Sequence, residues 1–295
     1  MKACQRLLNG AAVLCMAYGS PEGDEGIEAY FTHIRGGRPP SPQALEHLRE
    51  RYRAIGGSPL TTITRAQAEA LAGELGVPVF VGMKHAPPFI ADGVAKARAA
   101  GTVRLIGLPL APHYAEMSVG GYLTAIRKEW KGELVFVRGF HDHPAFVAAV
   151  HALIEEARQG FDPELVIFTA HSLPSRIESE GDPYRERLLE SCRLVAEAAS
   201  LPAWEFAFQS ASTTGEPWLG PSLDERLATL QARRVLVCPI GFVADHLEVL
   251  YDIDVEAMAA AKKRGIELRR TRSFNARPLF IKALGAIVRD QVLRT

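Results

Sequence analysis

The sequence predicts an α/β fold made of two similar domains, each with a four-stranded parallel sheet flanked by helices. Two observations support this prediction: short apolar runs alternate with longer amphipathic stretches, and the first half of the chain resembles the second. Buried strands that alternate with helices are typical of parallel βαβ units covered on both faces. A length of 295 residues accommodates two such domains.

The predicted strands are short apolar runs, four before about residue 140 and four after it. In chain order they cover residues 11–18, 77–84, 103–112, 133–140, 165–172, 204–211, 234–242 and 266–274. The amphipathic stretches between them predict helices over residues 41–57, 64–76, 119–130, 143–160, 183–200, 222–233 and 241–263. A terminal helix is expected over residues 275–295, packed back on the first domain.

An internal repeat supports the division into two domains. VLCMAYGSP in the first half resembles VIFTAHSLP in the second, so Tyr18 and His171 occupy the same position. RLIGLPLAP likewise corresponds to RVLVCPIGF. We therefore assign the N-terminal domain to residues 1–140, joined by helix 275–295, and the C-terminal domain to residues 141–274. Because ligands of open parallel sheets bind beyond the carboxyl ends of the strands, we expect one site between the domains.

Composition excludes several classes of function. Lys and Arg total 34 and Asp and Glu total 34, so no global field attracts nucleic acid or an anionic membrane. The cysteines form no CxxC pair and suggest a reducing, cytoplasmic location; they stand at positions 4, 15, 192 and 238. No stretch approaches the roughly 20 apolar residues of a membrane span, and the apolar run after Lys2 and Arg6 is too short for one.

An acidic row lies along the predicted helix 241–263. Four carboxylates recur at spacings of three, four and four: Asp245, Glu248, Asp252 and Glu256. At about 100° per residue they fall within an arc of roughly 80°. Like charges at i,i+4 repel by roughly 0.2–0.5 kcal/mol per pair. The row is either a solvated outer face or a path for cations or protons, and the sequence pattern alone leaves both open.

His171 is the candidate that carries chemistry. It ends an apolar strand, opposite Tyr18 in the repeat and in the same domain as the acidic row. Imidazole accepts a proton near neutral pH or binds a divalent metal, and a carboxylate such as Glu248 can do either as well. A His–Glu pair without cysteine suits a metal that visits the site, because closed structural zinc sites usually have four Cys or His ligands.

The first half supplies cationic side chains. Residues 30–60 are rich in arginine, whose forked guanidinium binds carboxylates bidentately. Several of these arginines are expected on the surface: Arg35, Arg38, Arg49, Arg51 and Arg53. The GGSP stretch that follows is a turn and not a phosphate loop, because no GxxxxGK[ST] or GxGxxG follows a strand.

An ordered series of motifs across nearly the whole chain resembles a known family. The motifs are MAYGSP, HIRGGRPPSP, RYRAIGGSPL, GMKHAPPFI, LAPHY, TAHSLP, GDPY, PWLGP and PIGFVADHLEVLYDIDVE. Together they resemble the ferrochelatases, most closely the bacterial coproporphyrin III ferrochelatases. The resemblance implies two Rossmann-like, chelatase-type domains with the active cleft between them. It also implies a lyase of haem biosynthesis that inserts Fe²⁺ into a porphyrin and releases two protons.

The resemblance also assigns roles to residues. It makes His171 the metal-binding and proton-accepting histidine, Glu248 its catalytic partner, and Tyr18 an axial ligand to the iron of the product. Asp252 and Glu256 match a secondary acidic path for metal or protons. The remaining matches are residues that hold the macrocycle and its propionates: Arg35, Arg51, Tyr52, Ser58 and Tyr122, together with Tyr18.

The expected substrates are coproporphyrin III and Fe²⁺. We expect no iron–sulfur cluster, because no Cys-rich tail precedes the final Thr295, and no organic cofactor. We also expect a monomer that has no nucleic-acid partner and no membrane span, and that hands its product transiently to other haem-biosynthesis enzymes.

Three alternatives remain open at this point. Protoporphyrin IX is the other candidate substrate; the Arg-bearing HIRGGRPP segment favours a substrate with four propionates over one with two. A cobalt or nickel chelatase for a sirohydrochlorin-type ring is a rival enzyme, against which HIRGGRPP and DHLEVLYDID argue. A haem or metal carrier is the rival without catalysis, although a carrier has no use for a base beside a cation path.

Overall fold

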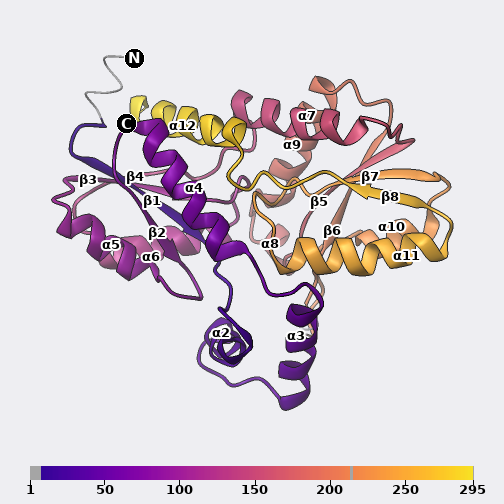
Figure 1. Ribbon diagram of the computed structural model, residues 1–295, viewed down its shortest axis with the longest axis horizontal. Coiled ribbons are helices and arrows are strands. Elements are labelled where there is room, and N and C mark those ends of the chain that lie inside the picture. The colour runs from indigo at the N-terminus through magenta and orange to yellow at the C-terminus, as the bar shows by residue number, and fades with distance from the viewer. Residues whose placement is uncertain (1–7, 213–214, 295) are drawn as a thin grey trace.

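The computed structural model describes residues 8–212 and 215–294 and contains two four-stranded sheets, both parallel throughout (Figure 1). The first sheet, in the order β2-β1-β3-β4, is formed by β1 (Ala11–Ala17), β2 (Val79–Met83), β3 (Arg104–Pro109) and β4 (Glu133–Phe136). The second, in the order β6-β5-β7-β8, is formed by β5 (Leu165–His171), β6 (Trp204–Gln209), β7 (Arg234–Cys238) and β8 (Glu267–Arg270). The predicted fold class and all the predicted strands are confirmed, and the matching strand orders follow the repeat.

Helices flank both sheets. Those associated with the first half are α2 (Ile27–Ile34), α3 (Pro42–Ala54), α4 (Leu60–Leu75), α5 (Ile90–Ala99) and α6 (Gly121–Glu129), with the short 3₁₀-helix η1 (Asp24–Gly26) and the short π-helix η2 (Glu116–Gly120). Those that follow are α7 (Pro144–Arg158), α8 (Arg176–Ser179), α9 (Tyr184–Ala198), α10 (Leu223–Thr229), η3 (Glu248–Ala257), α11 (Met258–Lys263) and α12 (Pro278–Leu293).

Three helices were missed from the sequence, and a fourth begins earlier than predicted. Helices α2, α5 and the short α8 lie where we predicted none, and α4 begins at Leu60 instead of residue 64. In α5 the pattern is obscured by Gly93, since glycine disfavours a helix interior by about 1 kcal/mol. A Cβ atom at Gly93 would lie 2.5 Å from Leu14 Cδ1 and 2.7 Å from the carbonyl oxygen of Val81. The glycine therefore lets α5 approach the sheet closely.

One hydrophobic core spans both sheets. It joins Val13 of β1, Phe146 of α7, Phe168 of β5 and Phe280 of α12 in a single cluster of buried side chains. The terminal helix α12 packs against both α4 and α7 (Figure 1). The expected contact of α12 with the first half is thus present, whereas the domain boundary at residue 140 stays a prediction, because the core continues across it.

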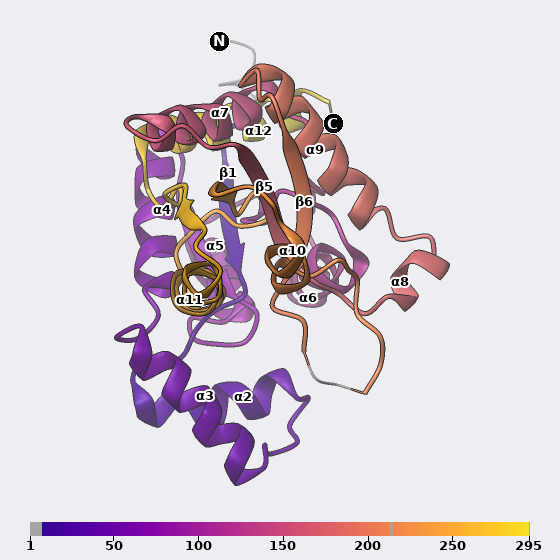
Figure 2. The same cartoon turned by 90° about the vertical axis from the view of Figure 1, so that its right-hand side faces the viewer.

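Helices α2 and α3 stand away from the two sheets (Figures 1 and 2). Their apolar faces form a small cluster with the second half of the chain, in which Ile27, Leu45 and Tyr52 meet Leu247. The chain reverses after α2 through consecutive glycines at 36 and 37 with φ values of +65° and +86°, a conformation that favours glycine. This turn separates α2, which Arg35 follows, from α3, which carries Arg51.

The thiols of Cys15, Cys192 and Cys238 are buried and free. Lys2, Cys4 and Arg6 lie outside the described residues. Among residues 8–212 and 215–294, no helix combines the length and the apolar character needed to cross a bilayer.

We predict that truncating Phe280 to Ala lowers the free energy of unfolding by about 3–5 kcal/mol, because a buried ring is replaced by a cavity. Phe280 is 0% exposed and stacks on Phe274 with ring centroids 4.5 Å apart. Chemical denaturation measures the change. The matched control is Leu279→Ala, since Leu279 is 49% exposed and its loss should cost under about 0.5 kcal/mol. Equal effects of the two substitutions would mean that α12 is not seated in the shared core.

Candidate active site

His171 is the last residue of β5, a strand paired on both sides within its sheet. Its Nδ1 contacts the carbonyl oxygen of Ser172. A carbonyl oxygen can only accept, so Nδ1 is the donor in this contact. The hydroxyl of Tyr184 donates to the carbonyl oxygen of His171 at 3.0 Å, which fixes the end of the strand. Nε2 is therefore the nitrogen free to accept a proton or bind a metal.

Glu248 lies at the start of η3, beside a histidine that we did not single out. Its Oε2 is 3.1 Å from His246 Nε2, and His246 Nδ1 is 2.8 Å from the carbonyl oxygen of Ala244. Because Nδ1 must donate to that carbonyl, the contact between Nε2 and the carboxylate requires one shared proton. Burial would raise the pKa of Glu248, but His246, His171, a backbone hydrogen bond and Arg51 together hold it below its ordinary value. The carboxylate is thus ionised beside His171.

The acidic row lies on a π-helix, whose hydrogen bonds run from i to i+5, and not on an α-helix as predicted. Glu248, Asp252 and Glu256 all belong to this π-helix. Glu248 is partly exposed, Asp252 is nearly buried and Glu256 is exposed. Asp245 precedes the helix and points elsewhere: it accepts hydrogen bonds from Ser273 Oγ at 2.6 Å and from the side chain of Asn275 at 2.8 Å. The predicted row therefore loses its first member.

Tyr18 follows β1 directly and is 41% exposed. Its ring lies 4.5 Å, centroid to centroid, from that of His85. Desolvation and then the charge of Glu248 raise the pKa of Tyr18 to about 12, so the phenol is neutral near pH 7. Nδ1 of His85 is 3.0 Å from Nδ1 of His33.

Helices α2 and α3 bring two more phenols toward Glu248. Desolvation and the charge of Glu248 both raise the pKa values of Tyr30 and Tyr52. The Tyr30 hydroxyl also donates to the carbonyl oxygen of Gly19 at 3.1 Å. Aromatic side chains of the first half therefore face the carboxylate of the second half.

The two predicted arginine anchors have different surroundings. Arg35 is exposed at the end of α2, where its Nε donates to the carbonyl oxygen of Arg38 at 3.3 Å. Arg51 is only 22% exposed and bonds to Asp252 through Nη2, with its guanidinium 4.8 Å from the centre of the Tyr251 ring. The fork of Arg51 is thus occupied by a protein carboxylate.

The other two predicted porphyrin contacts also have partners within the protein. Ser58 Oγ accepts from the backbone N–H of Leu60 at 3.4 Å, at the start of α4. Tyr122 is 5% exposed, and desolvation raises its pKa. The ammonium group of Lys84 lies 5.7 Å from the centre of the Tyr122 ring, and desolvation lowers the pKa of Lys84. Lys84 is therefore a cation at this site that we did not single out.

Sequence reasoning also missed Ser210, whose hydroxyl bonds to Asp252. His246 had a detectable signal, since it stands two residues before Glu248 in the DHLEVLYD motif. Lys84 and His85 lie inside GMKHAPPFI. No signal in the sequence indicated Ser210, because its contact with Asp252 arises only from the folding of β6 beside η3.

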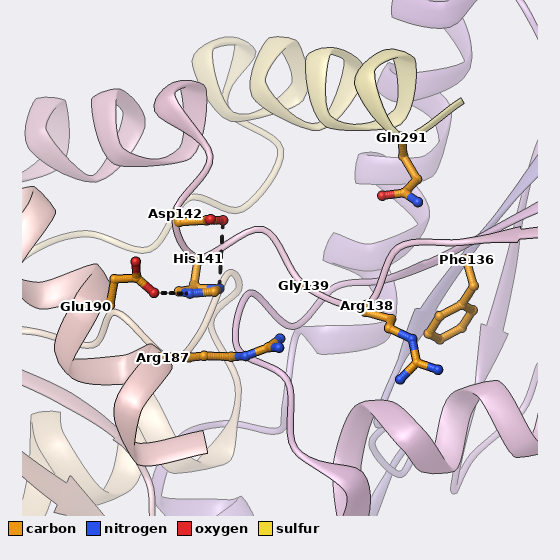
Figure 3. Close-up of a pocket in the computed structure, with 8 residues that line it drawn as sticks. All are labelled: Phe136, Arg138, Gly139, His141, Asp142, Arg187, Glu190 and Gln291. Atoms are coloured by element: carbon orange, nitrogen blue, oxygen red, sulfur yellow. Dashed lines mark hydrogen bonds and ion pairs between the residues drawn. The ribbon is translucent and has the colours of Figure 1, made fainter. Parts of the chain in front are cut away.

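A polar cavity of about 490 Å³ lies elsewhere, between the connection that follows β4 and helix α9 (Figure 3). Arg138 and Arg187 line it, and so does His141, which is 2.9 Å from Glu190. None of the predicted site residues lines this cavity. Within the part of the chain that the structure describes, no three His, Cys, Asp or Glu side chains form a group that could hold a metal ion.

Known proteins with similar sequences and folds identify the family. The sequence matches the Ferrochelatase family over residues 10–292. It is 42% identical over 300 residues to a ferrochelatase of Herpetosiphon aurantiacus, covering 95% of this chain and 98% of that protein. It is 38% identical over 303 residues to a coproporphyrin III ferrochelatase of a Geobacillus strain, covering 95% and 97%. The sirohydrochlorin chelatase SirB of Bacillus subtilis subspecies spizizenii has a similar fold, with a TM-score of 0.61 at 12% identity over 96% of both chains.

The fold is thus that of a chelatase. The chain belongs to the ferrochelatase family, the lyases of haem biosynthesis for which a porphyrin and Fe²⁺ are the substrates.

We predict that His85→Asn reduces the loss of stability in mild acid. Desolvation, Lys84 and His33 lower the pKa of His85 from 6.5 to about 4. Between those pH values the unfolded chain binds the extra proton, so the free energy of unfolding falls as the pH drops. The substitution should lower the pH dependence of the free energy of unfolding by at most about 1.4 kcal/mol per pH unit. The effect should be smaller than this limit because water reaches the ring.

Urea denaturation at several pH values between 7 and 4 measures this slope. His47→Asn is the control, because His47 is exposed on α3. If both variants kept the slope of the wild type, His85 would not be held neutral by its surroundings.

Proposed function

We propose that this chain inserts Fe²⁺ into coproporphyrin III to give Fe-coproporphyrin III, with His171 and Glu248 as the catalytic residues. One observation carries the proposal: burial and then the charge of Glu248 raise the pKa values of Tyr18 and Tyr52 in the first half, and His171 is among the groups that lower the pKa of Glu248. Aromatic side chains on one side and a base on the other suit a flat ligand that must lose protons.

The reaction requires a base and an entering cation. A free-base porphyrin carries two N–H groups and gives up both protons as Fe²⁺ binds the four nitrogens, so charge is conserved. A flat macrocycle keeps its nitrogen lone pairs in the ring plane. A site that fits a distorted ring exposes them and stabilises the transition state over the substrate. In this proposal Nε2 of His171 accepts the two protons in turn as the metal enters, and passes each one on before it takes the next.

Glu248 has two tasks in this scheme. Its ionised carboxylate stabilises the imidazolium that forms at His171, and with His246 it shares a proton that can move onward. Asp252 and Glu256 continue from Glu248 along η3 to an exposed position. We assign them to the secondary path along which metal arrives or protons leave. Tyr18, neutral and on the side of the first domain, would supply the axial oxygen to the iron of the product.

The choice of coproporphyrin III rests on the cations near the site. Four propionates need more cationic or hydrogen-bonding partners than two, and each charge-assisted hydrogen bond contributes about 1.5–3 kcal/mol where it is shielded from water. Arg35, Arg51 and Ser58 are our candidates for these contacts, together with Tyr52 and Tyr122. Relatives of similar identity carry both names, coproporphyrin III ferrochelatase and ferrochelatase, so protoporphyrin IX is the runner-up substrate.

The cellular setting belongs to the same proposal. Three buried free thiols suit a reducing compartment, which supports a cytoplasmic location. We further propose a monomer that hands its product to another enzyme of haem biosynthesis. Size-exclusion chromatography with light scattering tests the monomer, and a mass of twice the 32.2 kDa of the chain would contradict it.

We predict that His171→Ala lowers the rate of Fe²⁺ insertion more than tenfold, a barrier change above about 1.4 kcal/mol, while the protein stays folded and binds porphyrin. Glu248→Gln should cost far more rate than Glu256→Gln, because Glu256 is exposed at the far end of η3. Anaerobic insertion assays measure the rates, and porphyrin fluorescence checks binding. His171 would leave the mechanism if the Ala variant retained over a tenth of the wild-type rate.

We predict that kcat/KM for coproporphyrin III exceeds that for protoporphyrin IX by at least about tenfold, or about 1.4 kcal/mol, under matched detergent conditions. The reason is that a site built for four propionates leaves polar partners unpaired when two are missing. Arg51→Ala should narrow the gap by weakening the four-propionate substrate more. Equal or faster turnover of protoporphyrin IX would overturn the substrate assignment and leave the ferrochelatase activity in place.

A further inference from the structure

The ion pair between Arg51 and Asp252 links two elements that lie 201 positions apart in the sequence. Nη2 of Arg51, on α3, donates to Oδ1 of Asp252, on η3, and the guanidinium also lies 4.8 Å from the centre of the Tyr251 ring. The side chains of Arg51 and Asp252 are 22% and 9% exposed. The pair is thus shielded from water, unlike a surface salt bridge.

Both oxygens of Asp252 are in use. Oδ1 accepts from Arg51 and Oδ2 accepts from the hydroxyl of Ser210, which follows β6. Asp254, two residues further along the same helix, has a separate partner and bonds to Arg270 through both oxygens at 2.7 Å. Asp252 alone among the described carboxylates of η3 therefore bonds to a cation from the first domain.

The two partners of this pair have conflicting roles in the proposed reaction. Arg51 is the candidate anchor for a porphyrin carboxylate, and Asp252 is a candidate stop for the entering cation. Nη2 of Arg51 is the atom that faces Asp252. Nε of Arg51 is buried and has no hydrogen-bond partner among the described residues. A carboxylate of the substrate must therefore displace Asp252 from Arg51, or bind the guanidinium of Arg51 alongside Asp252.

We propose that Asp252 competes with a porphyrin carboxylate for Arg51, so that porphyrin binding frees Asp252 to receive the divalent cation. This inference rests on the proposed function. Asp252 and Ser210 are positioning residues here: Ser210 holds the carboxylate on η3 while Arg51 changes partner.

The physical basis is the cost of an unpaired charge. Once Arg51 turns to a substrate carboxylate, the hydroxyl of Ser210 is the partner that Asp252 keeps among the described residues, and a nearly buried charge without a counter-charge is costly. An arriving Fe²⁺ offsets this cost. By linkage, porphyrin and cation then each raise the affinity for the other. Before porphyrin arrives, Arg51 occupies Asp252 and keeps the cation from binding there.

Porphyrin affinity measured without metal provides the first test. The probe is coproporphyrin III, titrated with a metal chelator present and followed by fluorescence. Asp252→Asn should tighten binding at least about threefold, because Arg51 no longer has a competing charge. The control is Asp254→Asn, which removes the same charge from the same helix and should change the affinity less than twofold.

The tighter porphyrin binding of Asp252→Asn must depend on Arg51. In the Arg51→Ala background, adding Asp252→Asn should no longer tighten coproporphyrin binding. A tightening that persists there would reflect general charge repulsion and overturn the proposal. Unchanged or weaker binding by folded Asp252→Asn would overturn it too.

Cation affinity provides an independent test with no porphyrin present. The probe is Mn²⁺ alone, followed by electron paramagnetic resonance. Arg51→Ala should raise Mn²⁺ affinity at least about threefold, and the double variant with Asp252→Asn should lose the gain. Arg53→Ala is the control, since Arg53 lies on the same helix but pairs with Asp24 and Glu46. The competition would be contradicted if Arg51→Ala raised Mn²⁺ affinity no more than Arg53→Ala does. It would also be contradicted if the higher affinity persisted in the double variant.

These outcomes separate the inference from the proposed function. If the wild type failed to insert Fe²⁺ into either porphyrin, the proposed function would fall, and the competition for a porphyrin carboxylate with it. If the wild type inserts iron but Asp252→Asn does not tighten coproporphyrin binding, the competition alone is wrong.

Discussion

Two strands, β1 and β5, are each paired on both sides with parallel neighbours, and this pairing constrains the rest of the structure. β1 lies between β2 and β3, and β5 lies between β6 and β7. Every residue of β1 is buried, so the first side chain that can meet a ligand is the one that follows the strand, Tyr18. His171 occupies the same place in the other sheet. The repeated pairing thus sets a phenol in one half and an imidazole in the other at equivalent strand ends.

Charge is then distributed around these strand ends by elements that are not part of the sheets. The π-helix η3 carries Glu248 next to His246, and this pair shares one proton. Helix α3 reaches the same region through its ion pair with Asp252 and its apolar contact with Leu247. Since α2 and α3 stand away from the sheets, such contacts with the second half help to hold the predicted propionate anchor Arg51 in position.

Most of the strands could be predicted because they are short and largely apolar; β1 is apolar along its whole length, whereas β8 alternates and is mainly charged. The helices were less certain where packing overrides local preference. Gly93 weakens the helical signal of α5 and yet is needed there, since a Cβ atom would meet Leu14. The π-helical form of η3 has no signal in a spacing of four, which an α-helix also satisfies. The spacing of Asp245 also fits one face of an α-helix and so predicted it in the acidic row, although its side chain bonds to Ser273 and Asn275.

The sequence by itself determined the two parallel sheets, their repeat and the position of His171 at a strand end, because these follow from local apolar patterns and their order along the chain. The motif series likewise pointed to the ferrochelatase family. Only the tertiary structure decided which charges meet. Arg51 and Asp252 are far apart in the sequence, and each lies on a helix with several similar residues. Their pairing depends on how α3 docks against η3, a long-range packing arrangement that no local pattern encodes.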